Sequence, residues 1–249
     1  MLSKAQISLI TSLQHKKFRT QHNLFVVEGI KSVLEFAHSS YKVEKIFYTD
    51  EVLTKLDKIP QNIKCENVPD REFNKISCLK NPQGALALVQ LPPIQNIAIE
   101  QLKGTHHLVL DDVQDPGNLG TIIRTAEWFG IANILCSPHT VDAYNPKVVQ
   151  ASMGSLSRVN IHYLDIEELV ANTSLPTFGA FLEGNSIFKT DFGTEGLIIM
   201  GNEGNGIREG LKQRIRHKIT IPRIGQAESL NVAIATTIFC AEVARQRLL

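Results

Sequence analysis

The stretch LIIMGNEGNGIREG, residues 197–210, joins an apolar run to a loop that is rich in glycine. The run from Leu197 to Met200 is short and followed by glycine, which is typical of a buried strand. Glycine then returns at positions 201, 204, 206 and 210 around the carboxylate Glu203. Because parallel α/β sheets bind ligands where their strands end, this stretch predicts a ligand loop in a protein of the α/β class.

The glycine spacing argues against a dinucleotide-binding loop. Gly204, Gly206 and Gly210 form the pattern GxGxxxG, which is one residue longer than the Rossmann fingerprint. An oxidoreductase or ligase with a degenerate loop stays open as an alternative at this point. Glu203 itself has two interpretations. It is either a carboxylate held only by loop amides or one that lies beside a cationic or hydroxyl-bearing ligand.

Strands and helices alternate on both sides of this stretch, which predicts α/β architecture throughout. Two prolines at 92 and 93 cannot continue a strand, so we place a domain boundary there. The predicted organisation is a smaller α/β domain over residues 1–93, a linker over 94–105, and a mostly parallel α/β domain over 106–249. A closing helix, apolar on most sides from Val232 to Val243, indicates deep burial or a partner.

A second loop, DPGNLG, precedes a helix predicted from about Asn118 to Phe129. Asn118 is either the cap of that helix or a ligand contact. Arg124 either pairs with Glu127 one turn later or faces a ligand from the start of the helix.

A third loop, IPRIGQAESLN, ends at the closing helix. Ser229 and Asn231 are either caps of that helix or site residues. Pro222 and Gly225 predict a bent loop whose backbone groups face a ligand.

The composition excludes several classes of protein. The chain of 249 residues has no run of about 18 apolar residues and no cleavable leader pattern, so we expect a cytoplasmic protein without a membrane span. The four cysteines form no CxxC pair, and the eight histidines include no HExxH. We therefore expect free thiols and no metal site.

Charge is distributed unevenly along the chain. Residues 1–95 hold 13 basic and 9 acidic side chains, whereas the remainder holds 13 basic and 16 acidic ones. A basic first part is compatible with nucleic-acid binding. Lys16, Lys17 and Arg19, in a predicted basic loop, are the candidate phosphate contacts, although an ordinary solvated loop explains them equally well.

Taken together and in this order, the three loops resemble the motifs of the SpoU/TrmH family of the SPOUT class, the RNA ribose 2′-O-methyltransferases. The matching patterns are NxGxxxRxA from Asn118 to Ala126, GxExxG from Gly201 to Gly206, and IP followed by SLNVAxA from Ile221 to Ala235. The first part resembles the L30e-like substrate-binding domain of family members, in FVVEGIKSV and NPQGALALV.

The resemblance implies a parallel-sheet methyltransferase domain with a C-terminal trefoil knot. It also implies that S-adenosylmethionine binds in the knotted cleft through backbone groups, at Gly201, Gly206, Ile221 and Leu230. Close passage of chain and cofactor would account for the repeated glycines. The resemblance further implies a homodimer through the closing helix.

Arg124 is the catalytic residue that the resemblance implies, with Asn118, Glu203, Ser229 and Asn231 positioning it and the target nucleotide. Because a guanidinium is a very weak base, we expect Arg124 to orient a phosphate and stabilise negative charge. The implied partner is RNA, since DNA has no 2′-hydroxyl, with ribosomal RNA favoured over tRNA. A tRNA methyltransferase and a non-catalytic RNA-binding protein stay open as alternatives.

Overall fold

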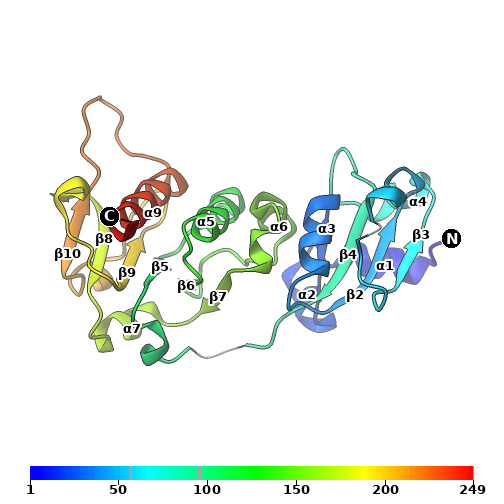
Figure 1. Ribbon diagram of the computed structural model, residues 1–249, viewed down its shortest axis with the longest axis horizontal. Helices are drawn as coiled ribbons and strands as arrows, with labels where there is room; N and C mark the ends of the chain where they lie inside the picture. Colours follow the sequence, from blue (N-terminus) through cyan, green and yellow to red (C-terminus); the bar gives the residue numbers. More distant parts are fainter. Residues whose placement is uncertain (57, 95–96, 249) are drawn as a thin grey trace. The chain divides into compact units, whose positions relative to one another are not determined.

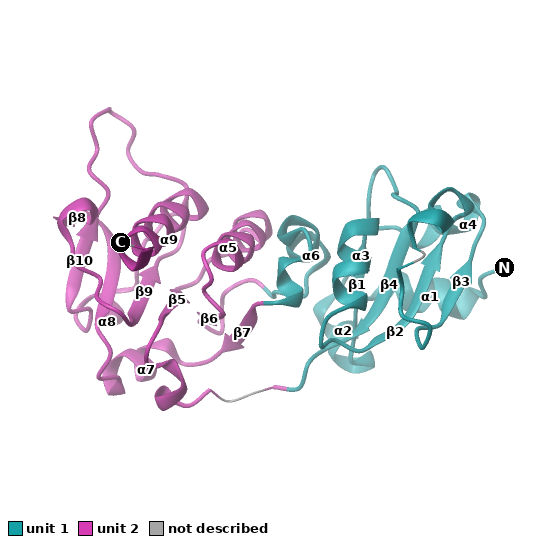
Figure 2. Cartoon of the chain, viewed as in Figure 1, with its two compact units in different colours: residues 1–93, 142–158 teal, residues 94–141, 159–249 magenta. Residues whose placement is uncertain are grey.

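The computed structural model describes residues 1–56, 58–94 and 97–248 (Figure 1). The chain forms two compact units, drawn in different colours in Figure 2. Unit 1 contains residues 1–93 and 142–158, and unit 2 contains residues 94–141 and 159–249. Within the described ranges, no helix has both the length and the apolar character needed to cross a membrane.

Unit 1 is built on a four-stranded sheet with the order β1-β4-β2-β3. β4 runs antiparallel to β1 and β2, whereas β2 and β3 are parallel. Its strands are β1 (Leu24–Glu28), β2 (Val43–Tyr48), β3 (Cys65–Asn67) and β4 (Ala85–Gln90). Its helices are α1 (Lys4–Ser12), α2 (Lys16–His22), α3 (Ile30–Ala37), the 3-10 turn η1 (Asp50–Lys55), α4 (Asp70–Ile76), α6 (Pro146–Ser152) and η3 (Ser155–Ser157).

The sheet of unit 1 has a core on each face. Helices α1 and α4 cover one face, where Phe47, Phe73 and Leu86 are buried in a shared cluster. On the other face, aromatic rings of Phe25, Phe36 and Tyr41 pack edge to face around α3. Edge-to-face packing of buried rings adds to the hydrophobic stabilisation of this small unit.

The segment 142–158 packs with unit 1, although the predicted domain 106–249 contains it. Helix α6 lies against β1, and the Tyr144 ring lies 4.9 Å from that of Phe25. Asp142 forms an ion pair with Arg19, whose side chain is buried. These contacts join distant parts of the sequence, so a division of the chain at one boundary does not describe the structure.

The predicted linker is partly folded. Its residues 95–96 lie outside the described part of the chain, but η2 (Ile99–Leu102) forms a turn of 3-10 helix. Leu102 is fully buried in the core of unit 2. The second half of the linker is therefore part of unit 2.

Unit 2 is a six-stranded sheet with the order β10-β8-β9-β5-β6-β7, in which every pair of neighbours is parallel. This confirms the predicted parallel α/β sheet. Its strands are β5 (His106–Leu110), β6 (Asn133–Cys136), β7 (Asn160–Tyr163), β8 (Thr177–Ser186), β9 (Gly196–Met200) and β10 (His217–Thr220). Its helices are α5 (Pro116–Trp128), α7 (Ile166–Asn172), η4 (Ile187–Lys189), α8 (Glu209–Lys212) and α9 (Val232–Leu248).

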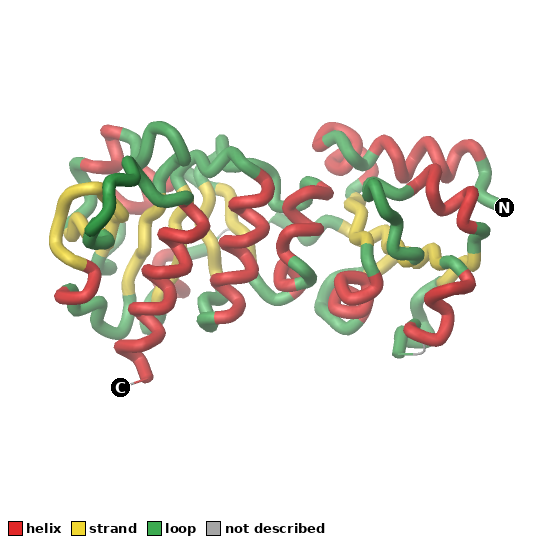
Figure 3. The backbone as a smooth tube through the Cα atoms, turned by 90° about the horizontal axis from the view of Figure 1, so that it is seen from above, coloured by secondary structure: helices red, strands yellow, loops and turns green. Residues whose placement is uncertain are grey.

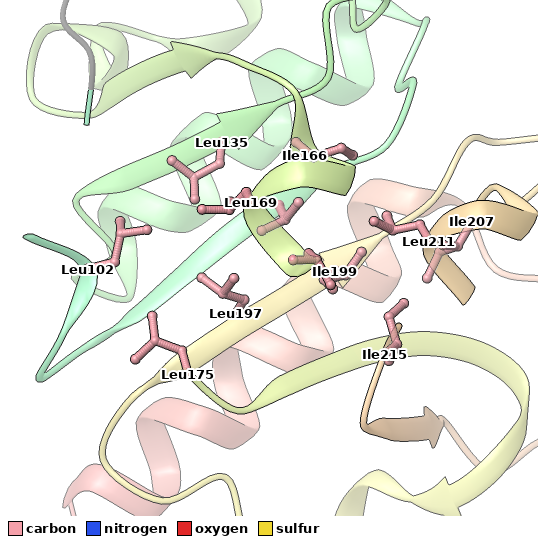
Figure 4. Packing of buried hydrophobic residues seen from close by; sticks show 12 residues of the cluster. Leu102, Leu135, Ile166, Leu169, Leu175, Leu197, Ile199, Ile207, Leu211 and Ile215 are labelled. Atoms are coloured by element: carbon pink, nitrogen blue, oxygen red, sulfur yellow. The ribbon is translucent and has the colours of Figure 1, made fainter. Parts of the chain in front are cut away.

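Helices cover both faces of this sheet (Figure 3). Alternate strand residues, among them Leu135, Leu197 and Ile199, point to the face covered by α7 and α8 and form the cluster in Figure 4. Helices α5 and α9 pack side by side, and their Thr125 and Thr237 hydroxyls lie 3.1 Å apart. Burial on both faces explains why the central strands read as continuous apolar runs.

The carboxyl ends of β5 and β9 lie next to each other, because these strands are paired in register from His106 with Gly196 to Leu110 with Met200. From β5 the chain continues to one side of the sheet through β6 and β7, and later fills the other side with β8 and β9. Such a switch point is where open α/β sheets bind ligands. Two of the three predicted loops begin here.

Candidate active site

Helix α5 starts two residues earlier than predicted, and its cap is Asp115 instead of Asn118. The Asp115 Oδ1 atom accepts a hydrogen bond of 2.8 Å from the amide of Asn118, and Pro116 occupies the first helical position. Pro at that position needs no amide hydrogen bond, so the sequence DPGN is suited to this start. The capping interpretation of Asn118 is therefore wrong, and its side chain is available for other contacts.

Glu203 connects the glycine loop to the start of α5. Its Oε1 accepts hydrogen bonds from the Asp115 amide at 3.1 Å and from Asn118 Nδ2 at 3.0 Å. Its Oε2 accepts one from the Gln114 amide at 3.2 Å. Partial burial raises the pKa of Glu203, but hydrogen bonds from the Asn118 side chain and from backbone amides lower it by more, so the pKa lies below its ordinary value. The site thus holds a carboxylate at neutral pH.

Asn118 also forms a hydrogen bond with the third loop. Its Oδ1 accepts a hydrogen bond of 2.9 Å from Asn231 Nδ2. Asn231 Oδ1 in turn accepts from the amides of Ala233, at 2.9 Å, and Ile234, at 3.3 Å, and so caps α9. One row of side chains, Glu203–Asn118–Asn231, therefore links all three loops. Asn231 therefore caps α9 and also donates a hydrogen bond to Asn118.

Arg124 lies two turns into α5 and is exposed. Its guanidinium makes no hydrogen bond or ion pair with any residue that the structure describes. A cation with no such partner is available to an anion or to developing negative charge. Thr121 and Trp128 are exposed on the same helix, three residues before and four after it.

The third loop, residues 221–231, is bonded to the rest of unit 2 much less than the other two. No described residue accepts a hydrogen bond from its backbone amides between 223 and 231, and its one internal bond joins the Arg223 side chain to the Ala227 carbonyl. Leu230 is half exposed, and no atom lies within 4 Å of where a side chain on Gly225 would begin. Free amides beside an exposed apolar side chain fit a ligand held by the main chain.

The predicted cofactor residues differ in what surrounds them. Gly206 has φ +66° and open space around it, whereas a Cβ on Gly201 would lie 2.2 Å from the Gly206 carbonyl carbon. Gly201 is thus required by the packing of its own loop. Ile221 follows the end of β10 and is partly buried, and Ser229 is exposed with no side-chain hydrogen bond to a described residue.

Sequence reasoning missed an ion pair at the base of the glycine loop. Asp111, fully buried at the end of β5, accepts hydrogen bonds from the Arg208 amide at 2.7 Å and from Arg208 Nε at 2.6 Å. Arg208 Nη1 also lies 3.7 Å from Glu167 Oε1. The pair fixes the far end of the loop to β5. A charged residue directly after a buried strand was the available signal, but its partner is 97 positions away.

The predicted RNA contacts in unit 1 separate into two kinds. Lys16 and Lys17 are exposed, at the start of α2 where a loop was expected. Arg19 is only 2% exposed, because it donates hydrogen bonds to the carbonyls of Leu13 and Gln14 and pairs with Asp142. A buried guanidinium with all these partners cannot reach a phosphate, so Arg19 is withdrawn from the candidate contacts.

The cysteines form no disulfide in the part of the chain that the structure describes. All four cysteines are free thiols, and burial raises the pKa of the Cys240 thiol to about 12. Among residues 1–56, 58–94 and 97–248, no group of three or more His, Cys, Asp or Glu side chains could hold a metal ion. The side chains that hydrogen bonds join across the three loops are one carboxylate, Glu203, and two amides, Asn118 and Asn231.

Comparison with protein families gives two matches, one in each part of the sequence. Residues 105–241 match the SpoU rRNA Methylase family, and residues 4–87 match the MRM3-like substrate binding domain. The first match contains all three loops of the site. The second contains α1 and all four strands of the unit 1 sheet up to Ala87.

Individual relatives agree with these matches. The chain is 31% identical over 231 residues to the 23S rRNA (guanosine(2553)-2'-O)-methyltransferase RlmP of Bacillus subtilis, covering 91% of this chain and 90% of that protein. The structure of a putative RNA methyltransferase of the TrmH family from Porphyromonas gingivalis is 36% identical, with a TM-score of 0.88 and 99% coverage of both chains. An AdoMet-bound rRNA methyltransferase from Sinorhizobium meliloti is 28% identical, with a TM-score of 0.84 and coverage of 100% and 97%. The chain belongs to the SpoU rRNA methylase family.

Proposed function

We propose that this protein transfers a methyl group from S-adenosylmethionine to a ribose 2′-hydroxyl of ribosomal RNA. The observation that carries this proposal is the hydrogen-bonded row Glu203–Asn118–Asn231, which joins three loops at the start of α5, the helix that also carries Arg124. The relatives named as 23S rRNA 2′-O-methyltransferases support the substrate class, and the AdoMet-bound relative supports the cofactor. RNA is required because DNA lacks the 2′-hydroxyl.

The cofactor is held by the main chain in this proposal. S-adenosylmethionine supplies an electrophilic methyl group on a sulfonium. Gly201, Gly206, Ile221 and Leu230 are the residues we assign to its binding, and the free amides of residues 223–231 support that assignment. Main-chain recognition also explains why no acidic ribose-binding residue is easy to find in the sequence.

Arg124 acts on the RNA. A ribose hydroxyl is a poor nucleophile until it is deprotonated or strongly hydrogen-bonded. A guanidinium keeps its proton at every physiological pH, so Arg124 orients the target phosphate and stabilises negative charge on the 2′-oxygen as the bond to carbon forms. The hydroxyl proton leaves to water.

Glu203 is a positioning group instead of a base. Its two oxygens already accept hydrogen bonds from Gln114, Asp115 and Asn118. A carboxylate with these donors and a lowered pKa has little tendency to take a proton. It holds Asn118 with one amide N–H free, and Asn118 with Asn231 and Ser229 places the target nucleotide.

Methyl transfer from labelled S-adenosylmethionine to separated rRNA and tRNA, both from cells that lack this protein, tests the proposal. We expect label in a 2′-O-methylated nucleoside of rRNA only. Arg124→Ala should lower the rate by roughly 10²–10³, as for the loss of one transition-state donor, and should keep the cofactor affinity. Label in tRNA alone would show that tRNA is the substrate instead of rRNA. An Arg124→Ala variant with normal turnover would exclude a catalytic role for Arg124.

The assembly and the path of the chain belong to the same proposal. We assign a homodimer through α9 and α5, supported by exposed apolar side chains at Ile234, Leu230 and Trp128. Sedimentation equilibrium should give twice the mass of 27.7 kDa, and a monomer at micromolar concentration would contradict it.

A C-terminal trefoil knot is the further expectation, supported by the likeness to the TrmH-family structure. We place the protein in the cytoplasm, with the ribosomal RNA.

A further inference from the structure

We propose that Asn202 is a positioning residue: its side-chain amide ties the glycine loop, residues 201–208, to residues 111–115 and thereby sets the place of Glu203. The proposal assigns a role to a position between the motif residues Gly201 and Glu203. It rests on the proposed methyl transfer, because Glu203 matters for activity only if the site methylates RNA.

Both ends of the Asn202 amide are used. Nδ2 donates a hydrogen bond of 2.7 Å to the carbonyl of Asp112, in the loop after β5, and a longer one of 3.5 Å to Glu203 Oε2. Oδ1 accepts from the amides of Gly204, at 2.9 Å, and Asn205, at 3.0 Å, and so closes the turn around Glu203. One side chain therefore shapes the turn and fixes it to the neighbouring loop.

The atom that accepts this bond is itself held firmly. Asp112 has a left-handed backbone, with φ +58°, and its amide donates to the hydroxyl of Ser137 at 2.9 Å. Ser137 is fully buried, lies 3.0 Å from the Thr140 hydroxyl, and donates back to Asp112 Oδ1 at 2.5 Å. The tie from Asn202 thus ends on a rigid point at the end of β5 and β6 instead of on a mobile loop.

The tie acts on Glu203 through the backbone and through the long hydrogen bond from Asn202 Nδ2 to Glu203 Oε2. Glu203 is the next residue, and its carboxylate meets the amides of Gln114 and Asp115, two and three residues after Asp112. The two loops thus pair at successive points, first through Asn202 and then through Glu203. A shift of the loop by about 1 Å would break the geometry of the second contact, and errors of that size cost about 10²-fold in rate.

The turn around Glu203 has hydrogen bonds of its own, apart from the bond between Asn202 Nδ2 and the Asp112 carbonyl. A substitution can therefore remove that bond and leave the turn closed. Asn202 and Gly206 exchange two backbone hydrogen bonds of 3.0 Å, and Oδ1 alone satisfies the turn amides. Asn202→Asp keeps an oxygen for those amides but has no N–H for the Asp112 carbonyl. Asn205→Asp adds the same charge three residues later, where the side chain is exposed and has no hydrogen bond to a described residue, and is the matched control.

The kinetic test is a double-mutant cycle on the full-length protein. We expect Asn202→Asp to lower kcat on RNA by about 10–100-fold, with Asn205→Asp within about threefold of wild type. In a Glu203→Gln background, Asn202→Asp should cost less than about threefold more, because residues that act through one another are not additive. A merely structural role predicts the full loss in both backgrounds, and that result, or normal kcat for Asn202→Asp, overturns the proposal.

Hydrogen exchange provides a readout that needs no activity. In Asn202→Asp the amides of Gln114 and Asp115 should exchange faster, while those of Gly204 and Asn205 stay protected. Unchanged protection at Gln114 and Asp115 overturns the proposal even if kcat falls. If the wild-type protein methylates no RNA, the proposed function fails, and the exchange data still decide whether Asn202 positions Glu203.

Discussion

The glycine loop, residues 201–208, and the third loop, residues 221–231, both follow strands of one parallel sheet, yet they are built in opposite ways. The glycine loop is fixed by side chains, through Asn202, Glu203 and the pair of the buried Asp111 with Arg208. The third loop has free backbone amides from 223 to 231 and is anchored at its end by Asn231. The glycine loop is hydrogen-bonded to neighbouring parts of unit 2, whereas the amides of the third loop from 223 to 231 donate to no described residue.

The two kinds of loop suit the two kinds of task in the proposed function. Groups that orient a transition state must be held before the substrate arrives, since ordering them during the reaction costs conformational entropy. Main-chain groups that surround a cofactor are satisfied by the cofactor itself, so they can stay unpaired until it binds. We therefore expect the glycine loop to be sensitive to small substitutions that the third loop tolerates.

The largest effect should come from the same substitution made in both loops. Gly201→Ala places a Cβ 2.2 Å from backbone atoms that cannot move aside, so we expect a loss of about 2–3 kcal/mol in the free energy of unfolding. Gly225→Ala adds its methyl group to open space and should change that free energy by less than about 0.5 kcal/mol. Urea unfolding measures the free energy of unfolding of both variants. Equal losses in the two variants would contradict the proposed difference between the loops.

A smaller effect should appear in the pH dependence of the Glu203 contacts. Because the folded pKa of Glu203 is lowered, its carboxylate stabilises the fold above its ordinary pKa near 4.5, and this contribution is lost as the pH falls through the lower folded value. Glu203→Gln should cost about 1 kcal/mol at pH 7, since solvent screens an exposed group. In unfolding experiments from pH 7 to 3.5 that difference should shrink with acid, and a difference that grows would contradict the assignment.

The smallest effect should come from exposed lysines that lie far from both loops in the sequence. Lys16 and Lys17 make no ion pair with a described residue, in contrast to Arg19. If they contact RNA phosphates, Lys16→Gln and Lys17→Gln should each lower the salt dependence of RNA affinity by about one unit of slope. Unfolding free energy should be unchanged. An unaltered slope would exclude both from the RNA interface.

The sequence was sufficient for features that depend on local pattern. Apolar runs followed by glycine predicted β9 and its loop, and alternation of strands with helices predicted the parallel sheet. The order of Asn118, Arg124, Glu203 and Asn231 along the chain was enough to suggest the family. The sequence could not predict the exact start of α5, because Asp115 and Asn118 are both residue types that favour the N-cap position. The backbone conformation decides which of the two is the cap.

The least predictable features connect residues that are distant in the chain. Arg19 was assigned to RNA because its neighbours are basic, whereas Asp142, 123 residues away, buries it. Residues 142–158 follow β6 in sequence but pack with unit 1, because α6 lies against β1. Composition and spacing contain no information about such partners.

The sequence alone determined the class of fold, the three loops and the chemical types of their side chains, because these follow from periodicity and residue identity. The tertiary structure determines which of these side chains have hydrogen-bond or ion-pair partners within the described protein and which have none. Glu203 is occupied by Gln114, Asp115 and Asn118, whereas Arg124 has no described partner. The physical reason is that a hydrogen bond or ion pair needs atoms within about 3 Å, and only folding brings groups from distant strands to that distance.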